Sequence, residues 1–535
     1  MASGFKLLCL AVALHMSSIG LCADEKYYRA AVHEIRQYND ESSSGSELIS
    51  KNMELYNQAA DIASFENCDI LVYAEKGLFP SKKSNSSWFI YYAEDVPSGN
   101  ERANPCDEEE YSDRPILKNL SCIAQEHSLT VVATLIDIKK CIVSEDCERT
   151  TINYCVSNAD ECPEDGIYRF NTQVVFNNRG TLIARYYKAH PFFEEGITTP
   201  KYAANVYYKT NYGIFVSYIG FDFFFYDSVK GVEKPWINAV TYANWWFDHT
   251  PFNYFSVSNQ QAWSMDNGVA VLSSDVHEPN LGSLGSGIYI PGKGALIYSY
   301  NPDGKSKLLI SNVPKSNSLS DNESLNTKFY YIDEDGTGTE LNGEEPRNFK
   351  SQCSIDVLGE ETSSFTDYRC HKTEVHQYTF TKLNDTSGQI DTCSNGFCCS
   401  LSYAAESMNE TFYFGVSGHR LKFYDTYWFG VQACFLARCE DVDGKQCRNF
   451  LLTSDTIFDD VEIKGSFETK HIYPHAMDTE LRLTDRNEWK FDGVSSMSYE
   501  SAKIFSWETH EILVFMGLYG RVSEQTDLKT ISKMD

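Results

Sequence analysis

The stretch Gly-Ile-Phe-Val-Ser-Tyr-Ile-Gly-Phe-Asp-Phe-Phe-Phe-Tyr-Asp, residues 213–227, decides the fold of this chain. Its apolar residues run almost without interruption from Ile214 to Phe225, between a glycine and an acidic residue. A short apolar run with such ends is typical of a fully buried strand. We therefore expect a buried strand that turns sharply into the next element of the chain.

The rest of the first half alternates between strand and helix patterns. Apolar residues recur at helical spacing between Ile49 and Ala63, whereas 68–74 is a short run of residues that favour strands. The turn Asn-Asn-Arg-Gly at 177–180 predicts a hairpin. Alternation of this kind predicts the α/β class, with a sheet buried by helices. The predicted elements are strands at 27–35, 68–74, 129–136, 172–176 and 182–187, helices at 49–63 and 116–125, and, beyond residue 227, a helix, a strand near Phe255, a helix near Trp263 and a strand at 269–273.

The chain is long enough for two folded units. It has 535 residues, and single cores usually stop growing at about 250–300 residues. A polar stretch between Lys315 and Asn326 is typical of a linker, and the segments beyond it are short, β-rich and interrupted by turns and cysteines. We predict a signal peptide at 1–22, an α/β domain at 23–315 and a smaller, disulfide-rich, mainly β domain at 316–535.

The N-terminus has the features of a secretory signal. Lys6 precedes an apolar segment at 7–14, and small residues lead to a cleavage position near Cys22 or Ala23. No other apolar run approaches the ~20 residues of a membrane-spanning helix, and the C-terminus has no hydrophobic tail. We therefore expect a secreted, extracellular product without a membrane anchor.

Cysteines and glycosylation sequons agree with export. Cys68 lies in an apolar run and is predicted to be a buried free thiol. The other cysteines after the signal form a group of six and a group of eight, which predicts disulfides within each unit: Cys106, Cys122, Cys141, Cys147, Cys155 and Cys162, then Cys353, Cys370, Cys393, Cys398, Cys399, Cys434, Cys439 and Cys447. Sequons predict glycosylated surface positions at Asn85, Asn119, Asn322, Asn384 and Asn409.

The charge balance limits the partners of the chain. There are 46 Lys and Arg against 75 Asp and Glu, a net charge of -29, which argues against nucleic acid and anionic membranes because both would be repelled. The sequence has no glycine-rich nucleotide motif, no P-loop and no His-Glu-x-x-His zinc motif. Since His190, His249 and His277 are scattered, we expect neither a metal nor a cofactor.

Two charged residues that follow predicted strands are candidates for chemistry. Glu75 ends the run Val-Tyr-Ala-Glu, and Lys188 ends the hairpin in Arg-Tyr-Tyr-Lys-Ala-His. A carboxylate and a lysine at strand ends can converge on one site, as a general base and a stabiliser of developing negative charge. Strand-end residues of this kind are also common on solvated surfaces. The aromatic run at 221–226 and the pair Trp245-Trp246 could line a ligand cleft or simply fill a core.

Several stretches together carry a family signal. Glu75 is followed by Lys188 in a Lys-x-His context, then by Gly-Ile-Phe at 213–215 and Phe-Asp at 221–222. Supporting stretches lie at 165–176, 184–188, 261–265, 285–291, 398–403 and 431–439. The set resembles the carbon-nitrogen hydrolase (nitrilase) superfamily and, more closely, its secreted vanin and biotinidase branch, over nearly the whole mature chain. The resemblance implies a four-layer α-β-β-α sandwich followed by a vanin-type C-terminal domain.

Members of that family are amidases that cleave pantetheine or biotin amides with a Glu-Lys-Cys triad. The resemblance implies that Glu75 is the general base and that Lys188 stabilises the oxyanion. Glu194 or Glu195 matches the accessory glutamate of the family. Lys76, next to Glu75, is expected to lower the pKa of that carboxyl and weaken it as a base.

The nucleophile position departs from the family pattern Gly-Ile-Phe-x-Cys-Phe-Asp. Alignment on Phe-Asp places Gly220 there, and alignment on Gly-Ile-Phe places Ser217 there. No cysteine occurs between Cys162 and Cys353, so no local realignment supplies a thiol. We expect a pseudoenzyme that binds a pantetheine- or biotin-like amide or an extracellular protein. The alternatives are an active amidase that cleaves a linear amide with a non-standard nucleophile, and a structural or storage protein.

Overall fold

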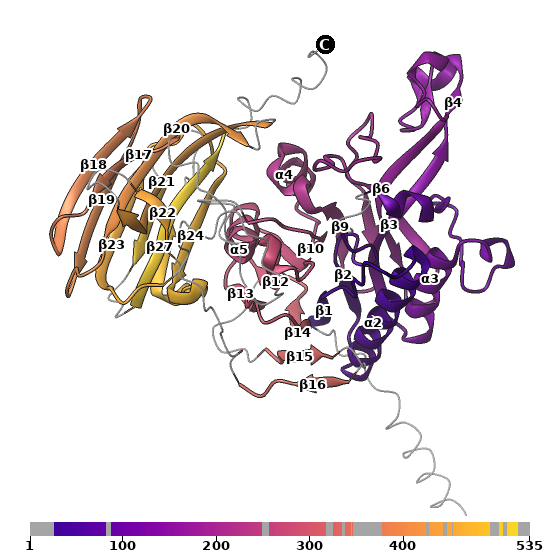
Figure 1. Cartoon of the computed structure of the whole chain (residues 1–535), viewed down its shortest axis with the longest axis horizontal. Helices are drawn as coiled ribbons and strands as arrows, with labels where there is room; N and C mark the ends of the chain where they lie inside the picture. The colour runs from indigo at the N-terminus through magenta and orange to yellow at the C-terminus, as the bar shows by residue number, and fades with distance from the viewer. Residues whose placement is uncertain are drawn as a thin grey trace, which may run out of the picture.

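The computed structural model has a helix-and-sheet part and a β-rich part that lie side by side (Figure 1). The predicted signal peptide at 1–22 and the strand expected near Phe255 lie outside the described residues. Within the part that is described, no helix is long and apolar enough to cross a membrane. The structure describes residues 26–81, 87–248, 256–316, 325–333, 337–343, 345, 377–423, 427–441, 447–451, 453–492, 502–506 and 511–522.

Two mixed sheets form the first part. The eight-stranded sheet has the order β16-β15-β14-β1-β2-β3-β6-β7, and the six-stranded sheet has the order β13-β12-β11-β10-β9-β8. In the centre of the sheets, β1, β2 and β3 run parallel to one another, as do β9, β10 and β11. The strands of the first sheet are β1 (Tyr27–Glu34), β2 (Ile70–Tyr73), β3 (Thr130–Lys140), β6 (Ile167–Phe176), β7 (Leu182–Tyr187), β14 (Ser306–Pro314), β15 (Lys328–Ile332) and β16 (Gly338–Glu340). Those of the second are β8 (Tyr207–Lys209), β9 (Ile214–Ile219), β10 (Ala239–Ala243), β11 (Ala270–Ser274), β12 (Ser286–Ile290) and β13 (Gly294–Ser299).

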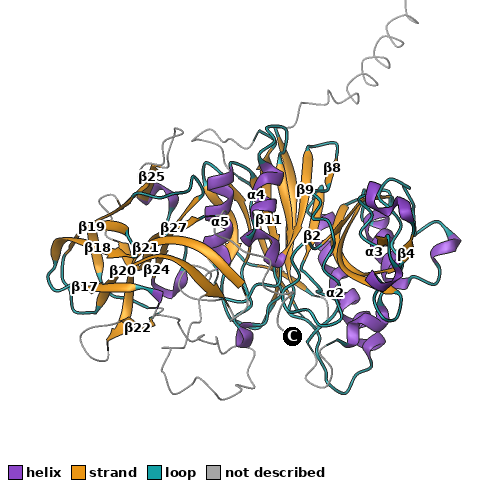
Figure 2. Cartoon of the chain, turned by 90° about the horizontal axis from the view of Figure 1, so that it is seen from above, coloured by secondary structure: helices purple, strands orange, loops and turns teal. Residues whose placement is uncertain are grey.

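The two sheets pack face to face, and helices cover their outer faces, as the view from above shows (Figure 2). Side chains alternate along each strand, so that Ala31 of β1 packs under the helices while Ala30 and Val32 lie in the layer between the sheets. The result is the four-layer α-β-β-α sandwich that was expected. The covering helices are α2 (Gly45–Phe65) and α3 (Pro115–Glu126) on the first sheet and α4 (Tyr226–Val232) and α5 (Ser256–Asn267) on the second.

The second part is built from an 11-stranded arrangement of antiparallel strands with its own apolar core. It confirms the predicted C-terminal, mainly β domain. Figure 2 shows α4 and α5 between this sheet and the second sheet of the sandwich. Its strands are β17 (Thr379–Lys382), β18 (Ser387–Ser394), β19 (Phe397–Ala405), β20 (Phe412–Phe423), β21 (Tyr427–Asp441), β22 (Cys447–Phe450), β23 (Ile457–Gly465), β24 (Ile472–Asp478), β25 (Trp489–Asp492), β26 (Ala502–Ser506) and β27 (Glu511–Arg521).

Every disulfide among the described residues joins two cysteines of the same predicted group. Cys353 and Cys370 lie outside the described residues. Cys68 is free and buried, as predicted, and burial raises the pKa of its thiol to about 12. The pairs are Cys106–Cys122, Cys141–Cys162 and Cys147–Cys155 in the sandwich, and Cys393–Cys398, Cys399–Cys434 and Cys439–Cys447 in the β domain.

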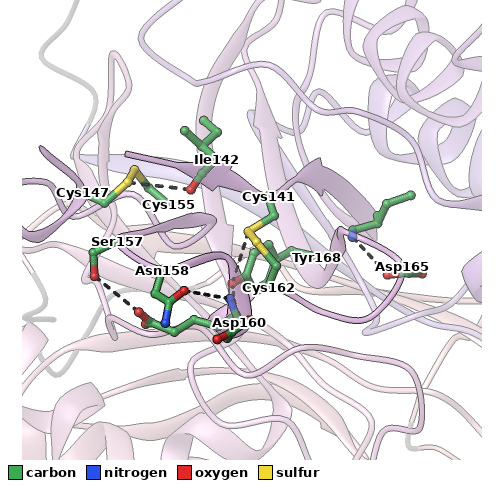
Figure 3. The surroundings of a disulfide bond; sticks show 12 residues. Cys141, Ile142, Cys147, Cys155, Ser157, Asn158, Asp160, Cys162, Asp165 and Tyr168 are labelled. Carbon is green, nitrogen blue, oxygen red and sulfur yellow. Dashed lines mark hydrogen bonds between the residues drawn. A yellow bond between two sulfur atoms is a disulfide. The ribbon is translucent and has the colours of Figure 1, made fainter. Parts of the chain in front are cut away.

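Two of these disulfides hold a lobe that projects beyond β3 and β6 (Figure 1). The Cys141–Cys162 bond closes the base of the lobe, and the Cys147–Cys155 bond lies inside it (Figure 3). The lobe has little core of its own, since Ile142 and Val143 of its strand β4 (Ile142–Val143) expose 43% and 51% of their surface. The two disulfides therefore stabilise the lobe in place of an apolar core, because each of them restricts the unfolded chain.

The strands after the predicted linker belong to the first sheet. β15 pairs with β14, and β16 pairs with β15, so the sandwich extends past the boundary predicted at 315/316. Ser, Asn and Asp are favoured both in linkers and in connections between antiparallel strands. Composition alone therefore could not separate a connection between domains from one within a sheet.

Candidate functional site

Three of the predicted site residues meet at one edge of the sandwich. Glu75 follows β2, Lys188 follows β7, and Gly220 follows β9. A backbone hydrogen bond from Glu75 N to the carbonyl of Asn244, 3.1 Å long, ties the end of β2 to the end of β10 in the opposite sheet. Glu75 and Lys188 are almost fully buried, with 2% and 3% of their surface exposed. The surface interpretation of these two residues is therefore wrong.

The ionic contacts centre on the Lys188 ammonium. Its Nζ lies 2.7 Å from Glu75 Oε1 and 2.6 Å from Glu194 Oε1. Asn171 of β6 bridges the same two carboxylates, because its Nδ2 donates to Glu75 Oε1 at 2.7 Å and to Glu194 Oε2 at 2.9 Å. Of the two accessory candidates, Glu194 is the one in contact with the triad positions, whereas Glu195 is exposed at the rim of the cavity.

Lys76 contacts Glu194 rather than the base position. Its Nζ lies 3.2 Å from Glu194 Oε2 and sits over the rings of Phe89 and Trp245, at 5.3 and 5.2 Å from their centroids. The ammonium is thus held by one carboxylate and two aromatic faces. The buried charges, two carboxylates and two ammonium groups, neutralise one another in contact.

Burial sets the proton affinity of Glu75. Desolvation raises the pKa of this carboxyl, and the attraction of Lys188 offsets only part of that effect. Lys76 acts in the expected downward direction, but the net shift is upward, so the expectation of a weakened base is corrected. For Glu194, burial also raises the pKa, yet Lys188 and Lys76 outweigh it and lower the pKa to about 2.

The same balance keeps the lysine charged. Burial lowers the pKa of Lys188, but the attraction of Glu194 and Glu75 raises it by more, and the net shift is upward. A cation is therefore fixed beside a carboxylate with raised proton affinity. This pair has the properties of a general base next to a stabiliser of an oxyanion.

Gly220 opens the 3-10 helix η5 (Gly220–Phe224) and has a left-handed backbone, with φ of +43°. This conformation is favourable for glycine and costly for other residues. Asp222 fixes the turn, since its carboxylate accepts hydrogen bonds from Ile219 N at 3.1 Å and Tyr186 Oη at 2.8 Å. Tyr242 Oη donates to the Gly220 carbonyl at 2.6 Å. The predicted sharp turn after a buried strand is confirmed.

A side chain at position 220 would point straight at the charged pair. A Cβ atom added to Gly220 would lie 2.2 Å from Glu75 Oε2 and 3.3 Å from Lys188 Nζ. Position 220 therefore lies beside both charged groups, and a side chain there would require the Glu75 carboxylate to move. Ser217 is buried on β9 opposite Thr241 of β10 and is not part of the cavity wall. The structure does not bring Ser217 together with Glu75 and Lys188.

A cavity of about 330 Å³ opens onto these residues. Glu75, Lys188 and Gly220 lie in its wall together with Phe221, Phe224, Trp245 and Trp246. In the aromatic run, Phe223 and Phe225 instead pack into the core. Both interpretations of the aromatic residues therefore apply, and Phe221 belongs both to the core and to the cavity wall.

The C-terminal domain supports this wall from outside. Phe429 of β21 packs against Phe221 and Phe224, with centroids 6.0 and 6.2 Å apart. Arg521 of β27 stacks over Phe429 at 4.1 Å and donates from Nη2 to the Phe224 carbonyl at 2.6 Å. The contact could not be predicted from sequence, because about 300 residues separate Phe224 from Arg521.

Asn171, Tyr242 and Arg521 are site residues that sequence reasoning missed. Asn171 lies within 165–176, a stretch that carried the family resemblance, but no motif distinguishes it from other polar strand residues. Tyr242 lies near the end of β10, and no motif distinguishes it from other strand residues either.

Three of the five sequons fall on described residues, and all three asparagines are exposed: Asn119, Asn384 and Asn409. Exposure is required for glycosylation. Asn85 and Asn322 lie outside the described residues.

Comparison with protein families agrees with this geometry. The carbon-nitrogen hydrolase family matches residues 29–228, and the vanin C-terminal domain family matches residues 368–526. Together the two matches cover more than half of the chain. The resemblance to the carbon-nitrogen hydrolase family, with a vanin C-terminal domain, is therefore confirmed for these two parts of the chain.

Curated relatives carry the same two names. A mouse pantetheinase is 26% identical over 89% of this chain and 83% of its own length. A human biotinidase is 27% identical over 94% of this chain and 90% of its own. Among solved structures, an amidase from Nesterenkonia sp. is similar over 55% of this chain and 92% of its own, at 16% identity and a TM-score of 0.38.

Proposed function

We propose that this chain is a secreted pseudoenzyme that binds a small amide in the cavity beside Glu75 and Lys188 without hydrolysing it. The observation that supports this most directly is the missing side chain at Gly220. In the covalent route an atom of that side chain must attack the carbonyl carbon. Here the position whose side chain would lie beside both Glu75 and Lys188 carries only hydrogen.

The binding half of the proposal rests on what the site keeps. A cavity of about 330 Å³ falls within the size range of small-molecule sites. Lys188 is placed to donate to a carbonyl oxygen, and the relatives that match this chain are named for pantetheine and biotin. We propose a pantetheine- or biotin-like amide as the ligand class.

Export and glycosylation are part of the same proposal. Six disulfides among the described residues fit an oxidising compartment, and the described sequons are exposed. An extracellular protein partner is the second binding role that the sequence predicted.

Binding and turnover are to be measured on the same preparation. The secreted full-length protein is titrated with pantetheine and with biotinamide by calorimetry, and release of amine is followed over hours. We expect binding that weakens in Lys188→Met and no release above the buffer rate. Release that Glu75→Gln abolishes would instead establish an amidase with a non-standard nucleophile. Absence of binding to either compound would refute the binding role.

A further inference from the structure

The cavity wall is dominated by aromatic rings. Nine of its 18 lining residues are Phe or Trp, and five of them, Phe192, Phe193, Phe224, Trp245 and Phe247, are partly or well exposed. Trp245 and Phe247 lie with their rings 5.9 Å apart and 25° from parallel. Large apolar surface in contact with solvent costs free energy unless a partner covers it. The wall therefore exposes more apolar surface than a ligand made of a polar chain would cover.

The buried charges of the cavity already have partners among themselves. Lys188 contacts both Glu75 and Glu194, and Lys76 contacts Glu194. A charged ligand would have to compete with one of these contacts in a partly desolvated site, at a cost of unpaired buried charge. An uncharged ligand leaves all of them intact.

Phe193 is held in an unfavourable state on two counts. Its φ of +47° is left-handed, which is rare for a bulky residue, and its ring is 54% exposed. The turn at this residue lets Glu194 direct its carboxylate to Lys188 while the Phe193 ring stays at the cavity mouth, in edge contact with Phe192 at 4.8 Å. Strained residues persist where the surrounding structure fixes them, often at ligand-binding sites.

We propose that the cavity selects uncharged amides that carry an aromatic ring, and that Phe193 packs on that ring. This inference rests on the proposed function, since it places the amide beside Lys188 and names the chemistry of the group attached to it. Ring contacts contribute beyond the area they bury. An aromatic amide should bind about tenfold more tightly than an aliphatic amide of similar size.

Three probe compounds test the aromatic ring and the charge of the ligand separately. N-benzylacetamide is compared with N-hexylacetamide, which lacks the ring, and with 4-(acetamidomethyl)benzoate, which adds a charge. Affinities are measured by ligand-observed NMR titration on the full-length protein, in parallel with pantetheine and biotinamide. We expect the benzyl compound to bind best, and the hexyl and charged compounds to bind about tenfold more weakly.

Phe193→Gly tests the role of the ring without unfolding the site. It removes the side chain and the left-handed strain together, so the thermal midpoint should stay or rise while affinity for N-benzylacetamide falls about tenfold and that for N-hexylacetamide changes little. Phe65→Ala, at an aromatic residue that is 80% exposed far from the cavity, is the matched control and should change neither affinity.

The outcomes distinguish failure of the aromatic preference from failure of the proposed binding function. If pantetheine or biotinamide binds but the benzyl and hexyl compounds bind equally, the aromatic preference is overturned and the binding function stands. If Phe193→Gly weakens all the probes alike, Phe193 is not a specificity residue and the inference fails. If no amide binds, both proposals fail together.

Discussion

Gly220 has a left-handed backbone, and a Cβ atom there would lie 2.2 Å from Glu75 Oε2 and 3.3 Å from Lys188 Nζ. Gly220 is therefore the one of the two predicted nucleophile positions that lies beside Glu75 and Lys188. Of the two alignments that the sequence left open, the geometry favours the one on Phe-Asp, and Ser217 lies on β9 outside the cavity wall.

Gly220→Cys should introduce amide hydrolysis. The added Cβ would overlap Glu75 Oε2 at 2.2 Å, so the Glu75 carboxylate has to turn aside to admit the thiol. The thiol would then lie beside a carboxyl whose pKa is raised by burial, which makes Glu75 the stronger base. We expect release of amine from pantetheine or biotinamide above the rate of the unmodified protein. Adding Glu75→Gln should lower this release by about 10²-fold or more.

Gly268→Cys is the matched control for this gain. Gly268 has φ of +65° and nothing within 4 Å of an added Cβ. A cysteine there therefore has the same kind of backbone strain as at position 220, but it does not lie beside Glu75 and Lys188. Folding of both variants is checked by circular dichroism. A folded Gly220→Cys protein that releases no more amine than Gly268→Cys would contradict the assignment of position 220.

Glu194 should make the protein sensitive to acid. Its pKa is lowered to about 2 in the folded protein, against about 4.3 for an unperturbed glutamate. The stability that it contributes is therefore full above pH ~4.3 and is lost as the pH falls towards 2, by about 3 kcal/mol in total. Urea unfolding between pH 5 and 2.5 should show a smaller loss in Glu194→Gln than in the unmodified protein.

Glu195→Gln serves as the neighbouring control, because Glu195 is exposed to solvent. It should follow the unmodified protein over the whole pH range. Equal acid sensitivity of Glu194→Gln and Glu195→Gln would show that the contact with Lys188 does not stabilise the fold.

At the scale of elements, strand β9 and the short helix η5 form a turn whose shape is held by side chains of other strands. Asp222 fixes the turn from within, Tyr186 of β7 reaches it from the first sheet, and Tyr242 of β10 binds the Gly220 carbonyl. A left-handed residue in such a turn keeps its position because several hydrogen bonds determine it.

Tyr242→Phe should loosen this turn. The variant loses the hydrogen bond to the Gly220 carbonyl and leaves that acceptor without its phenol partner, at a cost of about 1 kcal/mol in unfolding free energy. Ligand affinity should fall as well, since Gly220 lies in the cavity wall. Urea unfolding and calorimetry measure the two effects.

Tyr289→Phe is the control on the same sheet. The Tyr289 hydroxyl is buried without a hydrogen-bond partner among the described residues, so its removal should not lower stability. A loss as large as that of Tyr242→Phe would show that the effect comes from the layer around both tyrosines and not from the turn.

At the scale of the whole molecule, the C-terminal domain is part of the site rather than an appendage. Arg521 and Phe429 support η5 from outside, and Ser258 of α5 makes a buried hydrogen bond of 2.8 Å with His475 of β24. These contacts share one apolar core with the second sheet of the sandwich.

Arg521→Met should therefore weaken ligand binding at a distance. It removes the hydrogen bond to the Phe224 carbonyl while keeping an apolar side chain over Phe429, and should cost about 2 kcal/mol in unfolding free energy. A drop in affinity for N-benzylacetamide or pantetheine, seen by titration, would accompany it because Phe224 lines the cavity.

Lys470→Met removes an ion pair between the same two parts of the molecule. The pair joins Lys470 to Glu233 at 3.1 Å, but both side chains are well exposed, so its contribution should be small. If Lys470→Met and Arg521→Met weaken binding equally, the effect belongs to domain contact in general and not to support of the cavity wall.

Local patterns predicted many elements well because their cause is local. The hairpin of β6 and β7 follows from its glycine-containing turn, and the short apolar run at 214–219 is typical of a buried strand. The short strand β10 gave no clear pattern of its own, and the polar connection between β14 and β15 had the composition of a domain linker. In both cases the structure depends on which strands form hydrogen bonds with each other, and the local sequence does not contain that information.

The sequence by itself determined the α/β class, the disulfide-rich β domain, the free Cys68 and the absence of a cysteine near position 220. These features depend on residue types and on their spacing, and both are read directly from the sequence. Only the tertiary structure decided that Glu194 and not Glu195 joins Lys188, that burial outweighs Lys76 in setting the pKa of Glu75, and that the far domain supports the cavity. Each of these depends on distances and on desolvation in the folded chain, and neither exists before the chain folds.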